Sequence, residues 1–280
     1  MLRTCSAFLL LLTLTAGTSA QAAIFEYYVG KDKLPTFASG AYAGLPNPNF
    51  DRLTLLIAHG SHYHRIGDYS YTGTVPNQII QPTSSNNRLP EISSGLPGLE
   101  MAPGAGLYAG KLVTYNSAEE YDDLTFRSTQ ALDGYAPASP EFVLFNSSSQ
   151  RWNGTLDDTN VALQLVSKSA GLGIGTDSLL NVLNNPGDQL VLGDGNSLLS
   201  KLNFYVDGAT PAGTNFTAQF KLVNLGTSSI QESGVFNFDL QAVPEPSSIL
   251  LSVVGVIGGG IAVLRRKSLR TNAQRVGSPC

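Results

Sequence analysis

The three histidines of the chain lie close together, at His59, His62 and His64. His62 and His64 are two residues apart, so on a β-strand both imidazoles point to one face, with Cα atoms about 6.6 Å apart. One metal ion can reach both rings, because Zn–N distances are about 2.1 Å. His59 has the opposite parity, but a break at Gly60-Ser61 would let it fold back from a turn. The spacing therefore predicts a histidine-rich metal site.

Oxygen donors for this site are less certain from the sequence. Asp68 has the parity of the two strand histidines and is predicted as an oxygen ligand if the strand continues past Gly67. Glu91 and Glu100 are more remote candidates. Neutral imidazole suits zinc, copper, nickel or iron, and two cysteines are too few for a thiolate cage. These candidate ligands favour zinc, with a carboxylate or water as the last ligand. The alternative is a polar hairpin whose histidines bind no metal.

Short β-strands are the elements expected to position these side chains. Alternating apolar and polar residues indicate strands with one buried face, separated by turn residues such as Asn153-Gly154 and Pro186-Gly187. The only helix candidate is Asp177 to Leu183, which could equally be a strand. The pattern predicts an all-β fold, a β-sandwich or jelly roll. The other predicted strands lie at 25–29, 53–58, 69–71, 107–115, 124–128, 142–145, 161–166, 202–206, 216–222 and 236–240.

The composition narrows the classes of function. Of the 280 residues, 42% are hydrophobic, which is enough for a core and too much for a disordered chain. The net charge of -4 argues against a nucleic-acid partner, because phosphate binding needs a basic face. The sequence has no G-x-S-x-G elbow, and its glycines at 171–175 lack the spacing of a nucleotide-binding loop. We therefore do not expect an enzyme.

The N-terminal end has the pattern of a secretory signal peptide. Arg3 precedes an apolar run at 7–16, and Ala20-Gln21-Ala22 matches a cleavage site. The apolar run is too short to span a bilayer. A signal peptide at 1–22 is thus predicted, followed by an exported all-β ectodomain at 23–243.

The C-terminal end has a three-part pattern. Pro244-Glu245-Pro246 precedes an uncharged stretch at 247–264, and Arg265-Arg266-Lys267 follows it. The stretch is near the short limit for a transmembrane helix, and the basic cluster should stay cytoplasmic. The prediction is a sorting signal at 244–267 that includes a transmembrane helix at 247–264, and a polar cytoplasmic tail at 268–280.

This order of motif, apolar helix and arginine cluster resembles the PEP-CTERM sorting tail. The resemblance implies that Pro244, Glu245, Pro246, Arg265 and Arg266 form a signal recognised by an exosortase, which cuts near the motif. The extension at 268–280 is longer than such tails usually show. An ordinary C-terminal membrane anchor is the alternative, and in both cases most of the chain is expected at the cell surface or outside the cell.

A second resemblance covers most of residues 24–243. The segments that carry it are Leu45 to Phe50, Arg52 to Thr54, His62 to His64, Tyr69 to Gly73, Asn87 to Glu91 and Gly106 to Leu112. They resemble a cyanobacterial family of PEP-CTERM proteins that the zinc uptake regulator represses. The resemblance implies expression under zinc starvation, and a surface or matrix protein with clustered imidazoles would fit zinc capture or storage.

Two other functions stay open from the sequence. The first is a structural component of the extracellular matrix that binds no metal and has extracellular polysaccharide as a partner. The second is a cupin-like metalloenzyme, because His62-Tyr63-His64 followed by Asp68 partly resembles the first cupin motif. In that motif glutamate stands in place of Asp68, and no histidine follows His64 to supply the second motif.

Overall fold

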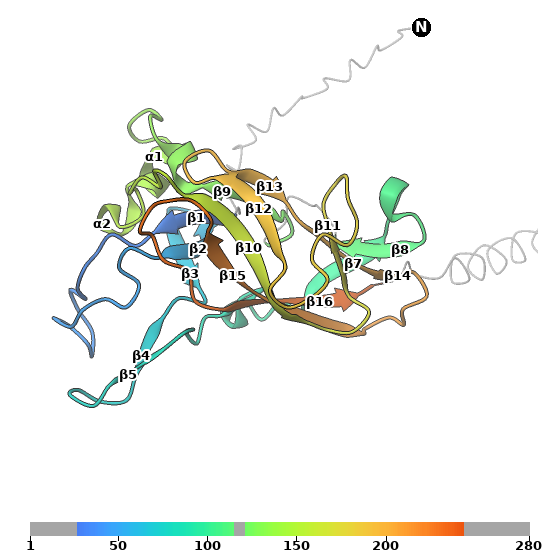
Figure 1. Cartoon of the computed structure of the whole chain (residues 1–280), viewed down its shortest axis with the longest axis horizontal. Helices are drawn as coiled ribbons and strands as arrows, with labels where there is room; N and C mark the ends of the chain where they lie inside the picture. The colour runs from blue at the N-terminus through green and yellow to red at the C-terminus, as the bar shows by residue number, and fades with distance from the viewer. Residues whose placement is uncertain (1–26, 115–120, 244–280) are drawn as a thin grey trace, which may run out of the picture.

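The computed structural model describes residues 27–114 and 121–243, which fold mostly as β-structure (Figure 1). The prediction of a β-rich fold is confirmed. The helical elements are α1 (Pro140–Phe145), α2 (Ser147–Gln150) and the 3-10 helices η1 (Ile92–Ser94), η2 (Gly106–Tyr108) and η3 (Thr129–Leu132). The strands are β1 (Tyr27–Lys31), β2 (Leu53–His59), β3 (His62–Ile66), β4 (Ser70–Thr72), β5 (Ile79–Gln81), β6 (Arg88–Leu89), β7 (Leu99–Pro103), β8 (Lys111–Thr114), β9 (Thr125–Ser128), β10 (Asn160–Lys168), β11 (Gly173–Gly175), β12 (Gln189–Asp194), β13 (Leu199–Lys201), β14 (Asn203–Asp207), β15 (Asn215–Asn224) and β16 (Phe236–Ala242).

Two large sheets make up the body of the molecule. The first has five strands in the order β13-β9-β1-β2-β3, so β3 is an edge strand. The second has nine strands and runs β11-β14-β8-β7-β16-β15-β10-β12, with β6 also paired to β16. Figure 1 shows the longer sheet continuing past the five-stranded one. Neighbouring strands are mostly antiparallel, which suits sheets with one face on the core.

One apolar core joins the two sheets. Alternate residues of β2, such as Leu55 and Ile57, belong to the same buried cluster as Phe220 and Phe238 from β15 and β16. The ring centroids of Phe220 and Phe238 lie 5.9 Å apart at an edge-on angle that aromatic pairs prefer. In β16 the alternation predicted from the sequence corresponds to alternating burial, with one face of the strand on the core.

The opposite face of the five-stranded sheet has a smaller core. Tyr63 of β3 and Trp152 are buried there, together with Leu144 and Phe145 of α1. The predicted strand at 142–145 is wrong, because these residues are helical. Ser139 caps α1 by accepting a 3.1 Å hydrogen bond from the Phe142 amide, and Pro140 occupies the first turn. These two signals outweigh the alternating pattern.

Two further sequence predictions need correction. The region 177–183 contains no helix; its chain turns back so that Val182 donates to the Ile174 carbonyl at 2.9 Å. Asp177 accepts a 2.9 Å hydrogen bond from Asn203, so it does not cap a helix. The predicted strand at 107–115 begins only at Lys111, because the preceding residues form η2.

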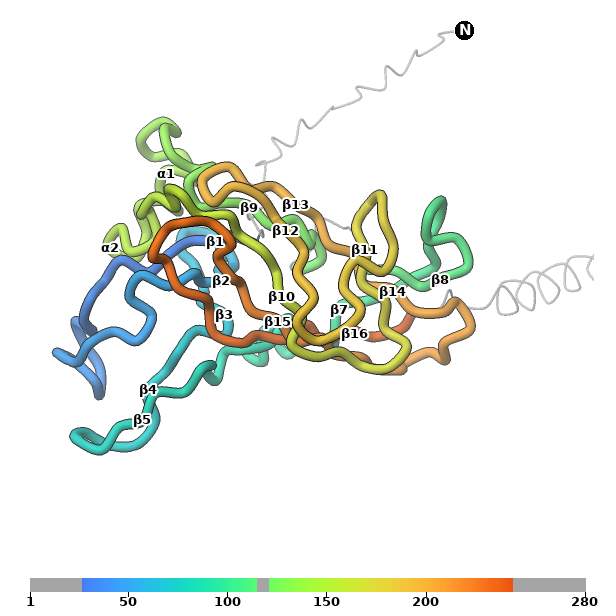
Figure 2. Tube along the Cα trace, in the orientation of Figure 1, coloured from blue at the N-terminus to red at the C-terminus, as the bar shows by residue number. Residues whose placement is uncertain are grey.

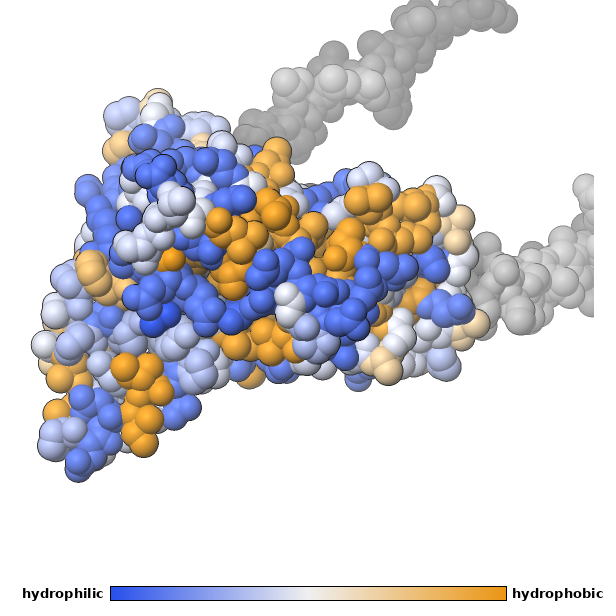
Figure 3. All heavy atoms as spheres, viewed as in Figure 1, coloured by the Kyte–Doolittle hydropathy of each residue, from blue (hydrophilic) through white to orange (hydrophobic). Residues whose placement is uncertain are grey.

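A two-stranded arm of β4 and β5 extends from the sheets (Figure 2). Ile79 and Ile80 on this arm are exposed, and Figure 3 shows apolar atoms there. Within residues 27–114 and 121–243, no helix is long and apolar enough to cross a membrane. The predicted signal peptide at 1–22, the sorting motif and the transmembrane helix at 247–264 lie outside the described residues.

Candidate metal centre

A tight β-hairpin brings the three histidines together. β2 and β3 pair so that His59 lies directly opposite His62, with only Gly60 and Ser61 between them. Gly60 has a φ of 62°, as the first central residue of a type II′ hairpin turn requires. The turn reverses the chain direction, so His59 lies on the same face of the hairpin as His62 and His64. Strand parity along the sequence alone would place it on the opposite face. The expectation that His59 folds back at Gly60-Ser61 agrees with this geometry.

The face that carries the histidines continues from the main core. In the hairpin register, His64 lies opposite Ile57 and Ile66 lies opposite Leu55. Ile57, Leu55 and Ile66 are buried, His64 is half-buried, and the two histidines at the turn are exposed. The hairpin is thus anchored at its base, while its tip presents imidazoles to solvent. Packing fixes the backbone of the hairpin, and the side chains of His59 and His62 at its tip are exposed.

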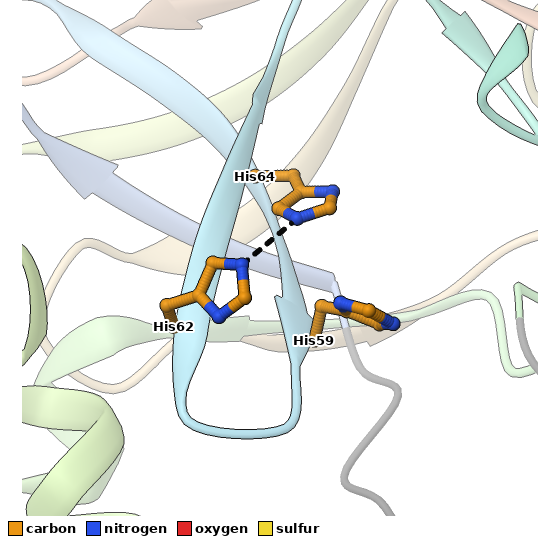
Figure 4. Close-up of side chains that lie close together, drawn as sticks. All are labelled: His59, His62 and His64. Atoms are coloured by element: carbon orange, nitrogen blue, oxygen red, sulfur yellow. Dashed lines mark hydrogen bonds between the residues drawn. The ribbon is translucent and has the colours of Figure 1, made fainter. Parts of the chain in front are cut away.

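The three rings form a nearly regular triangle (Figure 4). Their centroids are 4.9 Å apart for His62–His64, 5.0 Å for His59–His64 and 5.6 Å for His59–His62. A tetrahedral ion about 2.1 Å from each nitrogen would place neighbouring ring centroids about 5 Å apart. One ligand nitrogen from each histidine lies within 4.8 Å of the other two, so the group could hold a metal ion.

The closest nitrogens show which adjustment binding requires. Nε2 of His62 and Nε2 of His64 are 3.0 Å apart and share a hydrogen bond (Figure 4). Two ligands of one tetrahedral zinc ion are separated by about 3.4 Å. The ion would therefore replace the shared proton after a movement of a few tenths of an ångström, as estimated from that geometry. The His62 and His64 rings therefore fit a metal ion with little rearrangement, and the His59 nitrogen lies within 4.8 Å of both.

Glu91 fixes the orientation of His64. Nδ1 of His64 lies 2.8 Å from Oε2 of Glu91, whose side chain is only 3% exposed. A carboxylate only accepts hydrogen bonds, so Nδ1 of His64 donates and its Nε2 keeps a lone pair toward His62. Metal-bound histidines typically donate their other ring nitrogen to a carboxylate in this way. Glu91 is therefore placed behind the candidate ligand.

Glu91 is itself held by neutral donors. Tyr121 donates its hydroxyl to Oε2 at 3.0 Å, and Asn86 donates its amide to Oε1 at 2.6 Å. Asn86 also ties this segment to β3, because its amide donates to the Arg65 carbonyl and its carbonyl accepts from Gly67. A buried polar network with its hydrogen bonds made holds a single geometry. The backbone around β3 thus positions Glu91 as well as His64.

Asp68 lies beside β3 but points to different partners. Its Oδ2 accepts hydrogen bonds from the Arg65 guanidinium and, at 3.3 Å, from the Asn49 amide. Among the described residues, the group with metal-binding geometry consists of His59, His62 and His64, and does not include Asp68. The predicted oxygen ligand is instead part of an ion pair at the end of the strand. Glu100 lies on β7 beside β16 and is likewise outside the group.

The local electrostatics favour a neutral ring at the tip. Partial desolvation lowers the pKa of His62, and the neighbouring His64 and His59 rings lower it further, while Glu91 acts in the opposite direction. A lowered imidazole pKa means that the neutral form persists to lower pH. Neutral imidazole is the form that binds metal. Desolvation and, after it, the two neighbouring rings therefore favour the neutral form of His62.

A cavity of about 290 Å³ adjoins the cluster. Its lining includes His59, His64, Glu91, Ser93 and Leu96. Two of the three candidate ligands therefore border a space that a small molecule could enter.

The sequence pattern predicted Glu91 only as a remote ligand candidate and did not predict its position behind His64. A carboxylate 27 residues from a histidine has no local signal, because only β-sheet packing brings the two together.

Comparison of the chain with protein-family models, with curated proteins and with solved structures finds no match. The function must therefore be argued from this site.

Proposed function

We propose that this chain is an exported protein that binds zinc through His59, His62 and His64. The observation that carries the proposal is the contact of His64 with a buried carboxylate on one ring nitrogen and with His62 on the other. This arrangement fixes the tautomer and directs the second nitrogen to a position that a metal can share.

Zinc is proposed from the chemistry of the donors. Three imidazoles suit zinc, copper or nickel, whereas calcium and magnesium require oxygen ligands. The ring triangle has the size that a tetrahedral ion needs, and zinc prefers this geometry. The resemblance to proteins repressed by the zinc uptake regulator supports the same metal. The proposed role is capture or storage of zinc during starvation, without catalysis.

The place of action is proposed from the two ends of the sequence. The signal peptide pattern at 1–22 supports export, and the PEP-CTERM pattern supports recognition by an exosortase and attachment at the cell surface. The β-rich body, with two sheets sharing one core, supports a sandwich-like ectodomain. The structural matrix protein, with polysaccharide as its partner, is the function that remains if no metal binds.

Zinc analysis of the full-length chain, purified without a polyhistidine tag, tests the proposal. We expect about one tightly bound zinc per chain, as a single site with three protein ligands implies. Replacing His62→Ala together with His64→Ala should abolish binding while the far-ultraviolet circular dichroism stays unchanged. Ser61→Ala, an exposed change in the same turn, is the matched control and should retain the metal. Equal zinc content in the double variant and the wild type would disprove the proposal.

A further inference from the structure

The three histidines approach a shared ion from one side. His59 comes from β2, His62 and His64 come from β3, and all three lie on the same face of the hairpin. Three ligands at the corners of one triangle occupy one face of a tetrahedron, so the fourth corner lies away from the hairpin. Zinc sites with three protein ligands keep such a position for an additional ligand.

The nearby described carboxylates are engaged elsewhere. Glu91 uses Oε2 for His64 and Tyr121, and Oε1 for Asn86. Asp68 uses Oδ2 for Arg65 and Asn49. Within the described part of the chain, the metal-binding group therefore contains three imidazoles and no carboxylate. Among the described residues, no carboxylate therefore fills the fourth position.

The space beside the cluster can admit a donor for this position. The cavity of about 290 Å³ is lined by His59 and His64, and also by Glu91, Ser93, Leu96 and Tyr121. A water molecule takes about 30 Å³ of liquid volume, so the cavity has room for a small multi-atom ligand. His59 is exposed, so the cluster can be reached from solvent.

We propose that the ion bound by His59, His62 and His64 binds one small anionic ligand from outside the chain, next to this cavity. The inference rests on the proposed metal binding. A divalent ion with three neutral ligands keeps its full charge, and the one carboxylate behind His64 offsets only part of it. The remaining positive charge favours an anion over a neutral donor such as water. The protein would thus bind zinc as a ternary complex with a small anion.

Cobalt(II) in place of zinc, with azide as the probe, tests this proposal on the full-length chain. Cobalt(II) has visible absorption bands that change when a ligand enters or leaves its coordination sphere. We expect azide to produce a saturable change with a single-site dependence. The cobalt-treated His62→Ala, His64→Ala variant is the control and should show no such change. Addition of zinc should remove both the bands and the azide response.

The outcomes separate the two proposals. Cobalt binding that depends on the histidines but ignores azide would overturn the anion site and leave the metal site intact. An absence of cobalt binding, or equal binding by the double variant, would overturn both. A saturable azide response in the wild type alone supports both.

Discussion

Two buried carboxylates flank β3, and their surroundings differ. In the Asp68 corner, formed by Asp68, Arg65 and Asn49, the carboxylate is paired with a guanidinium. In the Glu91 corner, formed by Glu91, His64, Asn86 and Tyr121, the carboxylate accepts from an imidazole, an amide and a phenol. Their side chains are 7% and 3% exposed, so both carboxylates need compensation from the protein.

The difference lies in where the compensating charge comes from. Arginine is always charged, so the Asp68 corner is balanced whether or not a metal is bound. Among the described hydrogen-bond partners of Glu91, only His64 can bring a positive charge, as a proton or as a bound ion. The Asp68 corner therefore stabilises the fold, whereas the Glu91 corner would link the fold to the proposed metal ion.

Acidification should have the largest effect on zinc binding. A lowered pKa of His62 means that the unfolded chain binds protons more readily than the folded one, so the zinc-free fold loses stability as pH falls below the ordinary histidine value. Zinc competes with the same protons. We expect zinc affinity to fall roughly a hundredfold between pH about 7.5 and about 5.5, measured by titration calorimetry. Unchanged affinity over this range would argue against histidine ligation.

Glu91→Gln should have the next largest effect. Glutamine keeps an oxygen that can accept a hydrogen bond from Nδ1 of His64. The substitution removes the negative charge of Glu91, which would offset part of the charge of a bound ion. We expect zinc affinity to fall about 10- to 100-fold, as substitutions behind metal ligands do, with the fold retained. Competition with a chromophoric chelator measures the affinity. An affinity equal to that of the wild type would show that Glu91 acts only in folding.

The hairpin and its histidines were largely predictable from the sequence. The spacing of His62 and His64 fixes their common face, and Gly60 allows the turn that adds His59. Both signals are local, because strand parity and turn chemistry depend on neighbouring residues. The β-rich fold followed from the same kind of pattern. The prediction of secondary structure was wrong at 142–145 and 177–183, where capping and loop hydrogen bonds outweighed the periodic pattern.

The two corners were not predictable in the same way. Asp68 has the strand parity of a ligand, yet Gly67, with a φ of 65°, ends the strand, and the carboxylate pairs with Arg65. A Cβ atom on Gly67 would clash with the Val235 carbonyl oxygen, so tertiary packing sets this turn. Glu91 reaches His64 because Asn86 and β6 hold its segment in place. Such long-range contacts leave no periodic signal.

Tyr121→Phe should have a smaller effect than Glu91→Gln. It removes one neutral donor from Glu91 and leaves the contact with His64 in place. We expect the unfolding free energy to fall by about 1 kcal/mol, and zinc affinity to fall by less than about tenfold, because the charge behind His64 remains. Denaturant unfolding and chelator competition measure the two quantities. A loss of zinc affinity as large as that of Glu91→Gln would mean that Tyr121, and not the charge, positions the imidazole.

Asp68→Asn should have the smallest effect on zinc and is the matched control for Glu91→Gln. Both changes turn a buried carboxylate beside β3 into an amide, but only Glu91 contacts a candidate ligand. We expect zinc affinity to change by less than about threefold, while the unfolding free energy falls by roughly 1–2 kcal/mol because Arg65 loses its partner. Arg65 is 34% exposed, so water offsets part of that loss. If Asp68→Asn weakened zinc binding as much as Glu91→Gln, the distinction between the two corners would fail, and Asp68 would return as a candidate ligand.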